Sequence, residues 1–222
     1  MFQFLFLFLH YSLMKYELQN IISGTGKVKF GKPIQAAASH LKRSSRTGAL
    51  VENDKQIKRA ESESLSVFIE ENKLWITKIN FRNFVSEGAE QRVYLKNGKK
   101  VLKLNDAIYY LSWIDYFHNL LLNNYFFPAT AYNLKGFYLN DEILYAVVEQ
   151  TYVKATEKTE LKNVNEFLTQ NGFNKTKNND YFNPELGIIL EDLHDENVLT
   201  KTGDLFFIDT VFYLTDEFYT SH

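Results

Sequence analysis

The sequence predicts an α+β protein in which strands that follow one another along the chain form antiparallel pairs. Asn97-Gly98 lies between two apolar stretches and predicts a hairpin over about 91–104, since both residues tolerate turns with positive φ. Apolar residues recur at helical spacing over 105–124 and predict a helix after that hairpin. A second strand pair follows over 134–139 and 143–148. Runs of strands separated by single helices favour this class over a doubly wound sheet.

Shorter apolar runs predict the remaining elements. Their lengths suit strands or a short helix, and polar or glycine-containing turns separate them. We expect a hairpin with strands at 65–70 and 74–79, a helix over 164–170 that ends at Asn171-Gly172, and strands over 186–190 and 205–208.

The composition limits the classes of function. The chain has 222 residues, of which 45% are apolar and 16% aromatic, which is enough for one large domain or a small two-lobed one. The formal charge of −2 creates no field that would favour nucleic acid or an anionic membrane. Because the chain has no Cys, disulfides, thiolate zinc sites and cysteine nucleophiles are excluded. We expect a cytoplasmic protein.

An apolar extension over residues 1–13 precedes Met14 and leaves three alternatives open. Residues 2–9 are too few to span a bilayer, and no basic segment or small-residue cleavage site accompanies them. The translation start could have been assigned too early, with Met14 as the true start. The segment could instead be a strand or part of the core, or a crude signal for export or membrane contact.

Residues 14–66 form a basic leader, which we expect to be loosely ordered with one short helix near 34–41. Gly, Ser and Thr are frequent here and apolar periodicity is weak. A solvated linker, a contact with nucleic acid or phosphate, and a segment packed across the domain are the alternatives. Between Gly24 and Ala60 only Glu52 and Asp54 are acidic, whereas nine residues are basic: Lys27, Lys29, Lys32, Lys42, Arg43, Arg46, Lys55, Lys58 and Arg59.

The most informative segment places Asp192 five residues before Asn197, and Asp209 twelve residues after it at the end of an apolar run. Phosphoryl transfer requires phosphates and metal to be held and a hydroxyl to be aligned. Asn197 and Asp209 offer the hard oxygen ligands that Mg²⁺ prefers, and Asp192 would accept the proton of the acceptor hydroxyl. The alternatives are that Asp192 caps a turn and that Asp209 only ends a strand. For His194 we expect a structural hydrogen bond rather than a metal.

Upstream residues supply the other half of a nucleotide site. Lys103 lies on the second strand of the predicted hairpin, where its ammonium would neutralise the α- and β-phosphates. Gly88, which has no Cβ, would let backbone amides approach the phosphates. Taken singly, the lysine could be a solvated edge charge and the glycine an ordinary turn. The interpretation depends on their occurrence together, in this order, with the downstream motif.

These motifs resemble the protein-kinase-like superfamily. Residues 192–199, Asp-Leu-His-Asp-Glu-Asn-Val-Leu, are similar to the catalytic loop of its bacterial small-molecule-kinase branch, and Ile208-Asp209 is similar to the metal-binding Asp there. Val101-Leu102-Lys103-Leu104 resembles the strand that carries the phosphate-binding lysine. Residues 86–91 together with 191–194 most resemble the kinase domains of polyvalent proteins from bacterial mobile elements and phages.

The resemblance implies a compact two-lobed kinase-like fold. It would have a mainly antiparallel N-lobe over 67–152 with one helix, and a reduced C-lobe over 153–222. A hinge would bind adenine through backbone groups of Glu149, Gln150, Thr151 and Tyr152. The sequence departs from the family pattern at Leu190, where the loop motif has His. It also departs between 105 and 124, where there is no Glu, so that Asp106 or Asp115 would have to pair with Lys103.

The resemblance implies a Mg²⁺-dependent ATP phosphotransferase whose acceptor is a protein hydroxyl, the chain itself or a small molecule. Two alternatives remain open, a degenerate kinase-fold module that binds nucleotide or a protein partner, and an accessory protein of mobile elements that acts through the basic leader. A nucleotide is the expected partner, whereas nucleic-acid binding and stable membrane insertion are not expected. Hydroxyls in the leader are conceivable autophosphorylation sites, namely Ser44, Ser45, Thr47, Ser62 and Ser64.

Overall fold

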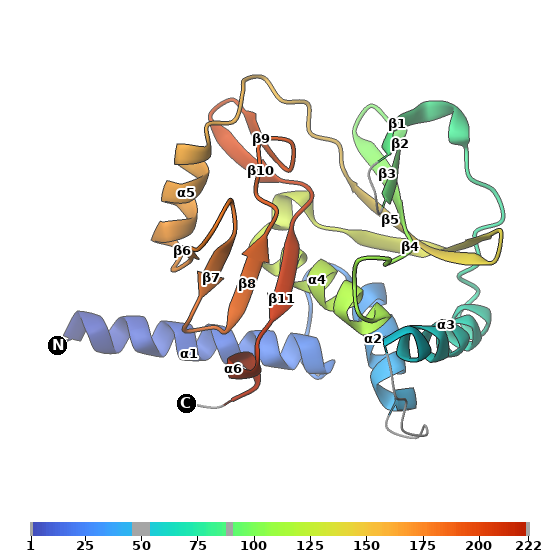
Figure 1. Ribbon diagram of the computed structural model, residues 1–222, viewed down its shortest axis with the longest axis horizontal. Coiled ribbons are helices and arrows are strands. Elements are labelled where there is room, and N and C mark those ends of the chain that lie inside the picture. The colour runs from blue at the N-terminus through green and yellow to red at the C-terminus, as the bar shows by residue number, and fades with distance from the viewer. Residues whose placement is uncertain (1, 46–53, 88–90, 221–222) are drawn as a thin grey trace. The chain divides into compact units, whose positions relative to one another are not determined.

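A computed structural model describes residues 2–45, 54–87 and 91–220 (Figure 1). The chain divides into two compact units. Val28–Tyr152 forms one, called here the central unit. Met1–Lys27 and Val153–His222 together form the other, called here the terminal unit. Helices and antiparallel strands occur in both, as expected for an α+β protein.

The central unit is built on a five-stranded sheet with the order β1-β2-β3-β5-β4, in which all neighbours are antiparallel. One face of the sheet carries an apolar cluster centred on Tyr94, Leu104, Tyr145 and Val147. Because side chains alternate along a strand, Lys103 projects from the opposite face to Leu104. The strands are β1 (Phe84–Glu87), β2 (Gln91–Asn97), β3 (Lys100–Asn105), β4 (Asn133–Asn140) and β5 (Ile143–Thr151).

The strand pairs predicted over 91–104 and over 134–148 are confirmed. In the β2–β3 turn the side chain of Asn97 accepts a hydrogen bond from the Lys99 N–H at 3.0 Å, and neither Asn97 nor Gly98 has a positive φ. In the β4–β5 turn Asp141 and Glu142 both have positive φ, at 48° and 65°. The chemistry of each turn therefore differs in detail from the prediction, although the hairpins themselves are present.

The helix predicted over 105–124 begins later, as α4 (Trp113–Phe126), with Ser112 as its N-cap. The side chains of Asn105 and Asp106 accept backbone hydrogen bonds from residues two positions further on, at 2.7 and 3.0 Å. These local bonds compete with helix formation, and the intervening segment forms turns instead. Phe117 of α4 meets Phe137 of β4 edge to face, so the helix covers the sheet.

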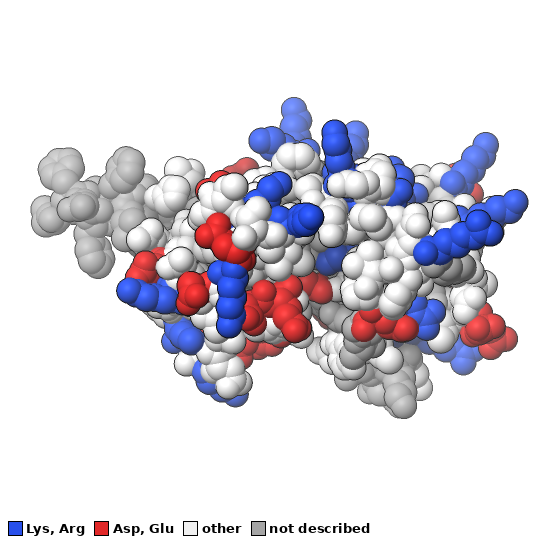
Figure 2. Space-filling model, turned by 90° about the horizontal axis from the view of Figure 1, so that it is seen from above, with Lys and Arg blue, Asp and Glu red and all other residues white. Residues whose placement is uncertain are grey.

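The expectation that the leader is loosely ordered is wrong for the residues described. They form the end of α1 (Phe2–Ser23), all of α2 (Lys32–Ser45) and most of α3 (Asp54–Glu71). Helix α2 buries Ile34, Ala37, Ala38 and Leu41 in a stripe whose small alanines conceal its periodicity. The face in Figure 2 carries both signs of charge, with Asp and Glu side chains gathered beside Lys and Arg.

The hairpin predicted over 65–79 is also wrong, because α3 continues to Glu71. Its buried side includes Glu61 as well as Leu65, Phe68 and Ile69, so the helical pattern contains a charged residue. After the helix, the Ile76 N–H donates to the Phe137 carbonyl at 2.8 Å, and the Phe137 N–H donates to the Leu74 carbonyl at 2.9 Å. The segment predicted as a second hairpin strand therefore runs parallel to β4 at one bridge.

The terminal unit contains a four-stranded sheet of order β11-β8-β7-β6 and a separate two-stranded sheet of β9 and β10. Helix α5 (Leu161–Gln170) extends the helix expected over 164–170 by one turn at its start. The strands are β6 (Asn174–Lys175), β7 (Tyr181–Asn183), β8 (Ile188–Glu191), β9 (Val198–Lys201), β10 (Asp204–Phe207) and β11 (Val211–Leu214). Strands β8 and β10 correspond to the predicted strands over 186–190 and 205–208.

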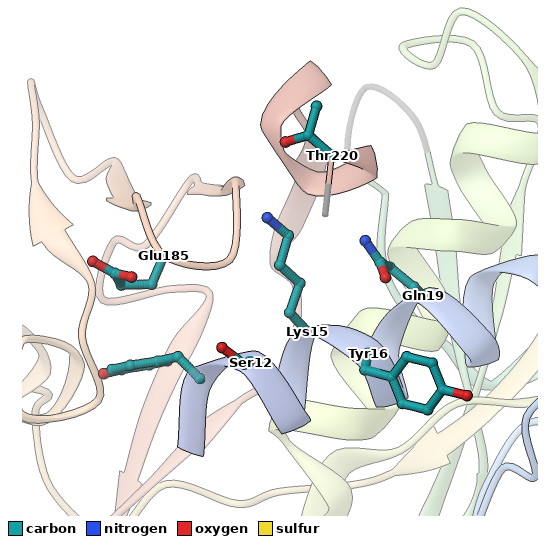
Figure 3. A pocket seen from close by; sticks show the side chains of 7 residues that line it. Ser12, Lys15, Tyr16, Gln19, Glu185 and Thr220 are labelled. Carbon is teal, nitrogen blue, oxygen red and sulfur yellow. The ribbon is translucent and has the colours of Figure 1, made fainter. Parts of the chain in front are cut away.

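The first helix joins this unit through hydrogen bonds to the last one, α6 (Asp216–Tyr219). Lys15 Nζ donates to the Glu217 carbonyl at 2.7 Å, and Gln19 Nε2 donates to the Phe218 carbonyl at 2.6 Å (Figure 3). Residues 2–9 lie in the helix rather than in a strand. Among the described residues, no helix is long and apolar enough to cross a membrane. A pocket of about 180 Å³ beside these bonds is lined by Tyr11, Ser12, Lys15, Tyr16, Gln19, Glu185 and Thr220.

Candidate active site

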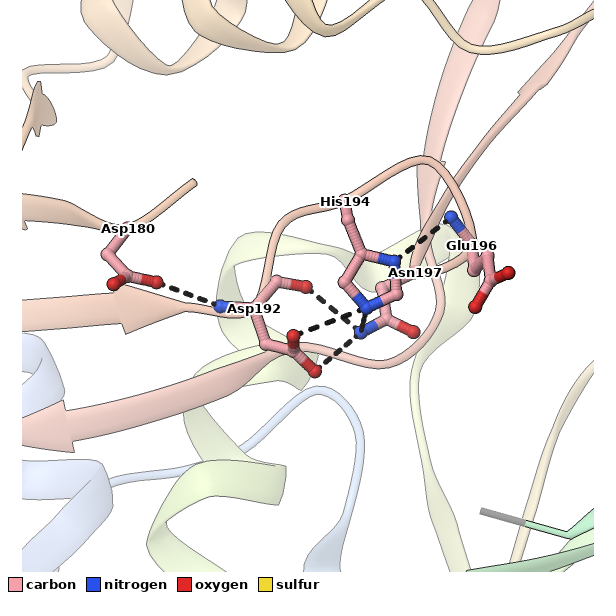
Figure 4. A network of polar contacts seen from close by, with 5 residues as sticks. All are labelled: Asp180, Asp192, His194, Glu196 and Asn197. Atoms are coloured by element: carbon pink, nitrogen blue, oxygen red, sulfur yellow. Dashed lines mark hydrogen bonds and ion pairs between the residues drawn. The ribbon is translucent and has the colours of Figure 1, made fainter. Parts of the chain in front are cut away.

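The motif from Asp192 to Asn197 forms the loop between β8 and β9 in the terminal unit (Figure 4). Leu190 precedes it in β8 and is fully buried, so the position at which the family motif has His contributes to the core here. The loop closes when the N–H groups of Asn197 and Val198 both donate to the His194 carbonyl at 3.0 Å. Asp192, at the loop's entrance, has φ of 67°. Asp tolerates this left-handed conformation better than most residues do.

The side-chain amide of Asn197 is directed at Asp192. Its Nδ2 donates to the Asp192 backbone carbonyl at 2.9 Å and to Asp192 Oδ2 at 2.7 Å. An amide has its nitrogen and oxygen on opposite sides, so these two bonds turn Oδ1 of Asn197 away from Asp192. That carbonyl oxygen is the atom that could hold a magnesium ion.

His194 braces the Asp192 carboxylate from a second direction. Its Nε2 lies 3.2 Å from Asp192 Oδ1, and its Nδ1 lies 3.3 Å from the N–H of Glu196. The tautomer with the proton on Nε2 satisfies both contacts, because Nε2–H donates to the carboxylate and Nδ1 accepts from the backbone. The 3.1 Å approach of Asn197 Nδ2 to Nε2 is then a contact between two donors rather than a hydrogen bond. His194 therefore has the structural role that the sequence predicts.

Asp209 is brought to the loop by the β9–β10 ladder. Phe207 lies opposite Val198 in this ladder. Ile208 and Asn197 follow as the next pair, since the Ile208 N–H donates to the Asn197 carbonyl at 2.9 Å. Residues opposite one another in an antiparallel pair have Cα atoms about 4.5–5.5 Å apart. Asp209 follows Ile208 directly and is partly buried. The hairpin thus places the carboxylate-bearing residue one position beyond the partner of Asn197.

A further carboxylate, which the sequence analysis did not identify, lies at the entrance of the loop. Asp180 Oδ1 accepts a hydrogen bond from the Asp192 N–H at 3.3 Å. Burial, together with the charges of Asp180 and Asp192, raises the pKa of Glu191 above its ordinary value. Negative charge is therefore concentrated where β8 ends. Asp180 lies twelve residues before Asp192, and no motif connects the two in the sequence.

Lys103 lies in the central unit, on β3, and is only 3% exposed. Its Nζ lies 3.5 Å from the hydroxyl of Tyr132 and 5.4 Å from the centre of that ring. The two carboxylates considered as its partners have other contacts. Asp106 accepts from the Ile108 N–H at 3.0 Å, and Asp115 accepts from the Ser112 hydroxyl at 2.7 Å. Gly88, the expected phosphate-loop glycine, lies outside the described residues.

The predicted hinge residues continue β5. The Tyr152 N–H donates to the Lys99 carbonyl at 2.9 Å, so alternation along β5 turns the backbone of Thr151 away from β3. Glu149 has the same orientation, but it faces Asn133 at the start of β4. Thr151 differs from Glu149 because it lies past the point where β4 begins. Of the four candidates, it is therefore the one whose backbone points away from β3 and does not face β4. An ion pair with Lys96 at 2.6 Å is the main reason why the pKa of Glu149 is lowered.

The donor set fits magnesium rather than a metal held by the protein alone. Among the described residues there is no group of three or more His, Asp or Glu that could hold a metal ion. Magnesium bound with a nucleotide needs only one or two protein oxygens, since water and phosphate supply the others. The orientation of the Asn197 amide meets this requirement for one ligand, and the carboxylate of Asp209 is of the right kind for a second. When bound, the ion would offset the negative charge of the phosphates.

The described hydroxyls of the leader are held within its helices. Ser44 and Ser45 donate to carbonyls of the preceding turn at 2.9 and 3.1 Å, and Ser64 donates to Ser44 at 2.9 Å. Ser62 accepts from the indole N–H of Trp113 at 2.9 Å. Thr47 lies outside the described residues. A phosphoryl acceptor among these four serines would have to leave its hydrogen bonds first.

The α+β fold and the loop are compatible with a kinase-like domain, and comparison with known families shows the particular family. A family model described as Serine/Threonine/Tyrosine Kinase found in polyvalent proteins matches residues 58–216, and the chain belongs to this family. The match includes most of α3, whose residues up to 66 were predicted to belong to the leader. Comparison with curated proteins and with solved structures gave no match.

Proposed function

We propose that this chain is a Mg²⁺-dependent ATP phosphotransferase. The observation that carries the proposal is the pair of hydrogen bonds from Asn197 to Asp192, which orients a carboxylate and a carbonyl oxygen on one loop. Membership of a kinase family supports transfer of a phosphoryl group as the reaction. The expected acceptor is a hydroxyl of a protein, of the chain itself or of a small molecule.

In the proposed reaction the acceptor oxygen attacks the γ-phosphorus of ATP while the bond to the β,γ-bridging oxygen breaks. Asp192 takes the acceptor's proton, and His194 holds one oxygen of that carboxylate through Nε2–H. ADP leaves with the electron pair of the broken bond. For Asn197 and Asp209 we propose contact with the metal, for Lys103 contact with the phosphates, and for the backbone at Thr151 contact with adenine.

The test is transfer of label from [γ-³²P]ATP with Mg²⁺, first to the chain itself and then to added protein and small-molecule hydroxyls. We expect the wild type to transfer label and Asp192→Asn to lose at least about 100-fold, since a general base typically contributes 10²–10⁴-fold. Asn keeps the left-handed backbone conformation and removes the base, together with one of the two side-chain oxygens that accept from Asn197 and His194. Equal transfer by both proteins would rule out Asp192 as the base.

A second candidate is a module that binds nucleotide without transferring phosphate. The burial of Leu190 in place of the family's His favours it, because this position cannot contribute a polar group to the loop. Thermal unfolding with and without ATP and Mg²⁺ tests whether the chain binds nucleotide. Both candidates predict a higher unfolding temperature with ligand, whereas a chain that has lost nucleotide binding would show no shift. Ligand at 100 times its Kd adds about 2.7 kcal/mol of apparent stability. A shift without label transfer to any acceptor would support the module.

A further inference from the structure

Helix α4 reaches the buried lysine of β3 through two intermediate residues. Asn124, in the last turn of α4, forms two hydrogen bonds to the backbone of Tyr132: its Oδ1 accepts from the N–H at 2.6 Å, and its Nδ2 donates to the carbonyl at 2.9 Å. These two hydrogen bonds fix the orientation of the Asn124 amide, because the oxygen must face the N–H and the nitrogen must face the carbonyl. They also hold the backbone from which the ring of Tyr132 projects.

Tyr132 in turn meets Lys103 with both its hydroxyl and its ring. The ammonium lies 3.5 Å from the hydroxyl oxygen and 5.4 Å from the ring centre, within the range of a cation–π interaction. Lys103, Tyr132 and Asn124 are 3%, 4% and 5% exposed, so all three side chains are buried. The only acidic residue of α4 is Asp115, at its opposite end.

We propose that Tyr132 is the positioning residue for Lys103, and that α4 sets the position of the ammonium through Asn124 and Tyr132. This inference rests on the proposed function for its consequence, since Lys103 is the residue proposed to contact the phosphates. A buried ammonium needs partners that replace water. The face of a tyrosine ring attracts the cation without carrying a formal charge, so it can orient the ammonium without neutralising it.

A neighbouring side chain keeps the segment around Tyr132 in place. Gln150 Nε2 of β5 donates to the Thr130 carbonyl at 2.8 Å, two residues before the tyrosine. Gly31 lies close to the Asn124 amide, and a Cβ at this position would lie 2.6 Å from Nδ2. Residues of the same unit therefore contact both the segment before Tyr132 and the Asn124 amide.

The first experiment measures the rate at which each lysine is reductively methylated, read by mass spectrometry. We expect Lys103 to react slowly in the wild type and in Tyr132→Phe, which keeps the ring, and at least about tenfold faster in Tyr132→Leu. Asn124→Ala should give an intermediate rate. Lys58 is the internal control, because it lies in the same unit and its ammonium is bound to the carbonyls of Ala107 and Tyr110.

Two outcomes of this experiment would overturn the proposal. One is an unchanged Lys103 rate in Tyr132→Leu. The other is an equal acceleration at Lys58, which would show that the variant only loosens the unit. Tyr145→Leu is the matched control, since Tyr145 is a buried tyrosine of the sheet that carries Lys103, and its ring faces Arg92. It should leave the Lys103 rate unchanged.

The second experiment compares the affinities for ATP with Mg²⁺ and for adenosine by calorimetry. Tyr132→Leu should weaken ATP binding about tenfold and leave adenosine binding unchanged, because only the phosphates are proposed to contact Lys103. Equal losses for both ligands would contradict a role confined to the lysine. A wild type that binds neither ligand would defeat the proposed function, whereas the methylation rates would still decide whether Tyr132 positions Lys103.

Discussion

The Nδ2 atom of Asn197 lies 2.7 Å from a carboxylate oxygen of Asp192 and 2.9 Å from the backbone carbonyl of the same residue. One amide group therefore fixes both the backbone and the side chain of the proposed base. This relationship explains why Asn is suited to the fifth position after Asp192. A carboxylate there would have no hydrogen to donate.

Asn197→Asp should abolish this support. Its two carboxylate oxygens would face the oxygens of Asp192, so two hydrogen bonds would be replaced by repulsion, which corresponds to about 1–3 kcal/mol. We expect label transfer to fall at least about 100-fold and amide hydrogen exchange over 192–198 to accelerate. Asn178→Asp is the control, because Asn178 is exposed and already left-handed in the same unit. Unaltered exchange in the loop would contradict this account.

The positive φ of Asp192 gives a prediction that is independent of catalysis. Substitution by Asn, Gly or Ala removes the carboxylate in each case, and all three should lose transfer. Only Ala adds the strain of a left-handed residue, about 1–2 kcal/mol. Hydrogen exchange of the loop should therefore be fastest in the Ala variant. If Ala and Gly exchanged at equal rates, the left-handed conformation would not be important for the loop.

The strands and the polar motif could be predicted because their signals are local. The turns at Asn97 and Asp141 lie between strands that pair with each other, and Asn197 and Asp209 are joined by a single hairpin. Helix α3 was missed because its buried side contains Glu61, and the helix predicted from residue 105 began late because Asn105 and Asp106 bind the backbone locally.

The residues that support the site could not be predicted in the same way. Asp180 reaches Asp192 from β7's side of the sheet, and Tyr132 reaches Lys103 across 29 residues of chain. Each contact depends on tertiary packing, and neither residue belongs to a motif with a fixed spacing. Sequence patterns therefore identify the groups proposed for the chemistry more readily than the groups that hold them.

Glu61 makes the stability of the central unit depend on pH. Burial raises the pKa of Glu61 to about 7, even though its carboxylate accepts the Trp113 N–H at 2.5 Å. The folded state thus binds the proton more tightly than the unfolded state. The associated stability is fully present below the unfolded pKa of about 4.3 and is lost as pH rises through 7, with a total of ~3 kcal/mol.

Glu61→Gln should remove this dependence. We expect the variant to match the wild type near pH 5 and to exceed its free energy of unfolding by ~1–3 kcal/mol at pH 8. Urea unfolding followed by tryptophan fluorescence is suitable, since both tryptophans, Trp75 and Trp113, lie in the central unit. Glu63→Gln, on the exposed side of the same helix, is the control. Parallel pH profiles of wild type and Glu61→Gln would disprove the assignment.

His118 is expected to give the opposite pH dependence. The contribution of Glu61 is therefore measured as the difference between wild type and Glu61→Gln, in which the contribution of His118 cancels. Burial lowers the pKa of His118 to about 4, so its contribution to stability is present above the unfolded pKa of about 6.5 and is lost as pH falls. His118→Leu should therefore flatten the acid limb of the unfolding profile between pH 6.5 and 4. An unchanged acid limb would mean that His118 accepts a proton without loss of structure.

Lys15 gives a prediction for the terminal unit. It is 5% exposed, and its ammonium donates to the Glu217 carbonyl, while Gln19 donates to the next carbonyl of α6 (Figure 3). Lys15→Met keeps the apolar stem but removes one hydrogen bond from a carbonyl that also accepts from Thr220, a loss of about 0.5–1.5 kcal/mol. We expect faster hydrogen exchange in α6 and earlier proteolytic cleavage after Leu214.

The matched variants decide whether the effect comes from the hydrogen bond. Gln19→Leu removes the neighbouring bond, and the double variant should lose less than the sum of the single losses because both bonds hold the same short helix. Tyr16→Phe changes an exposed residue of α1 and should leave exchange in α6 unchanged. If Lys15→Met also left α6 unchanged, packing around Phe218, which is fully buried, would be sufficient to hold the helix without the lysine.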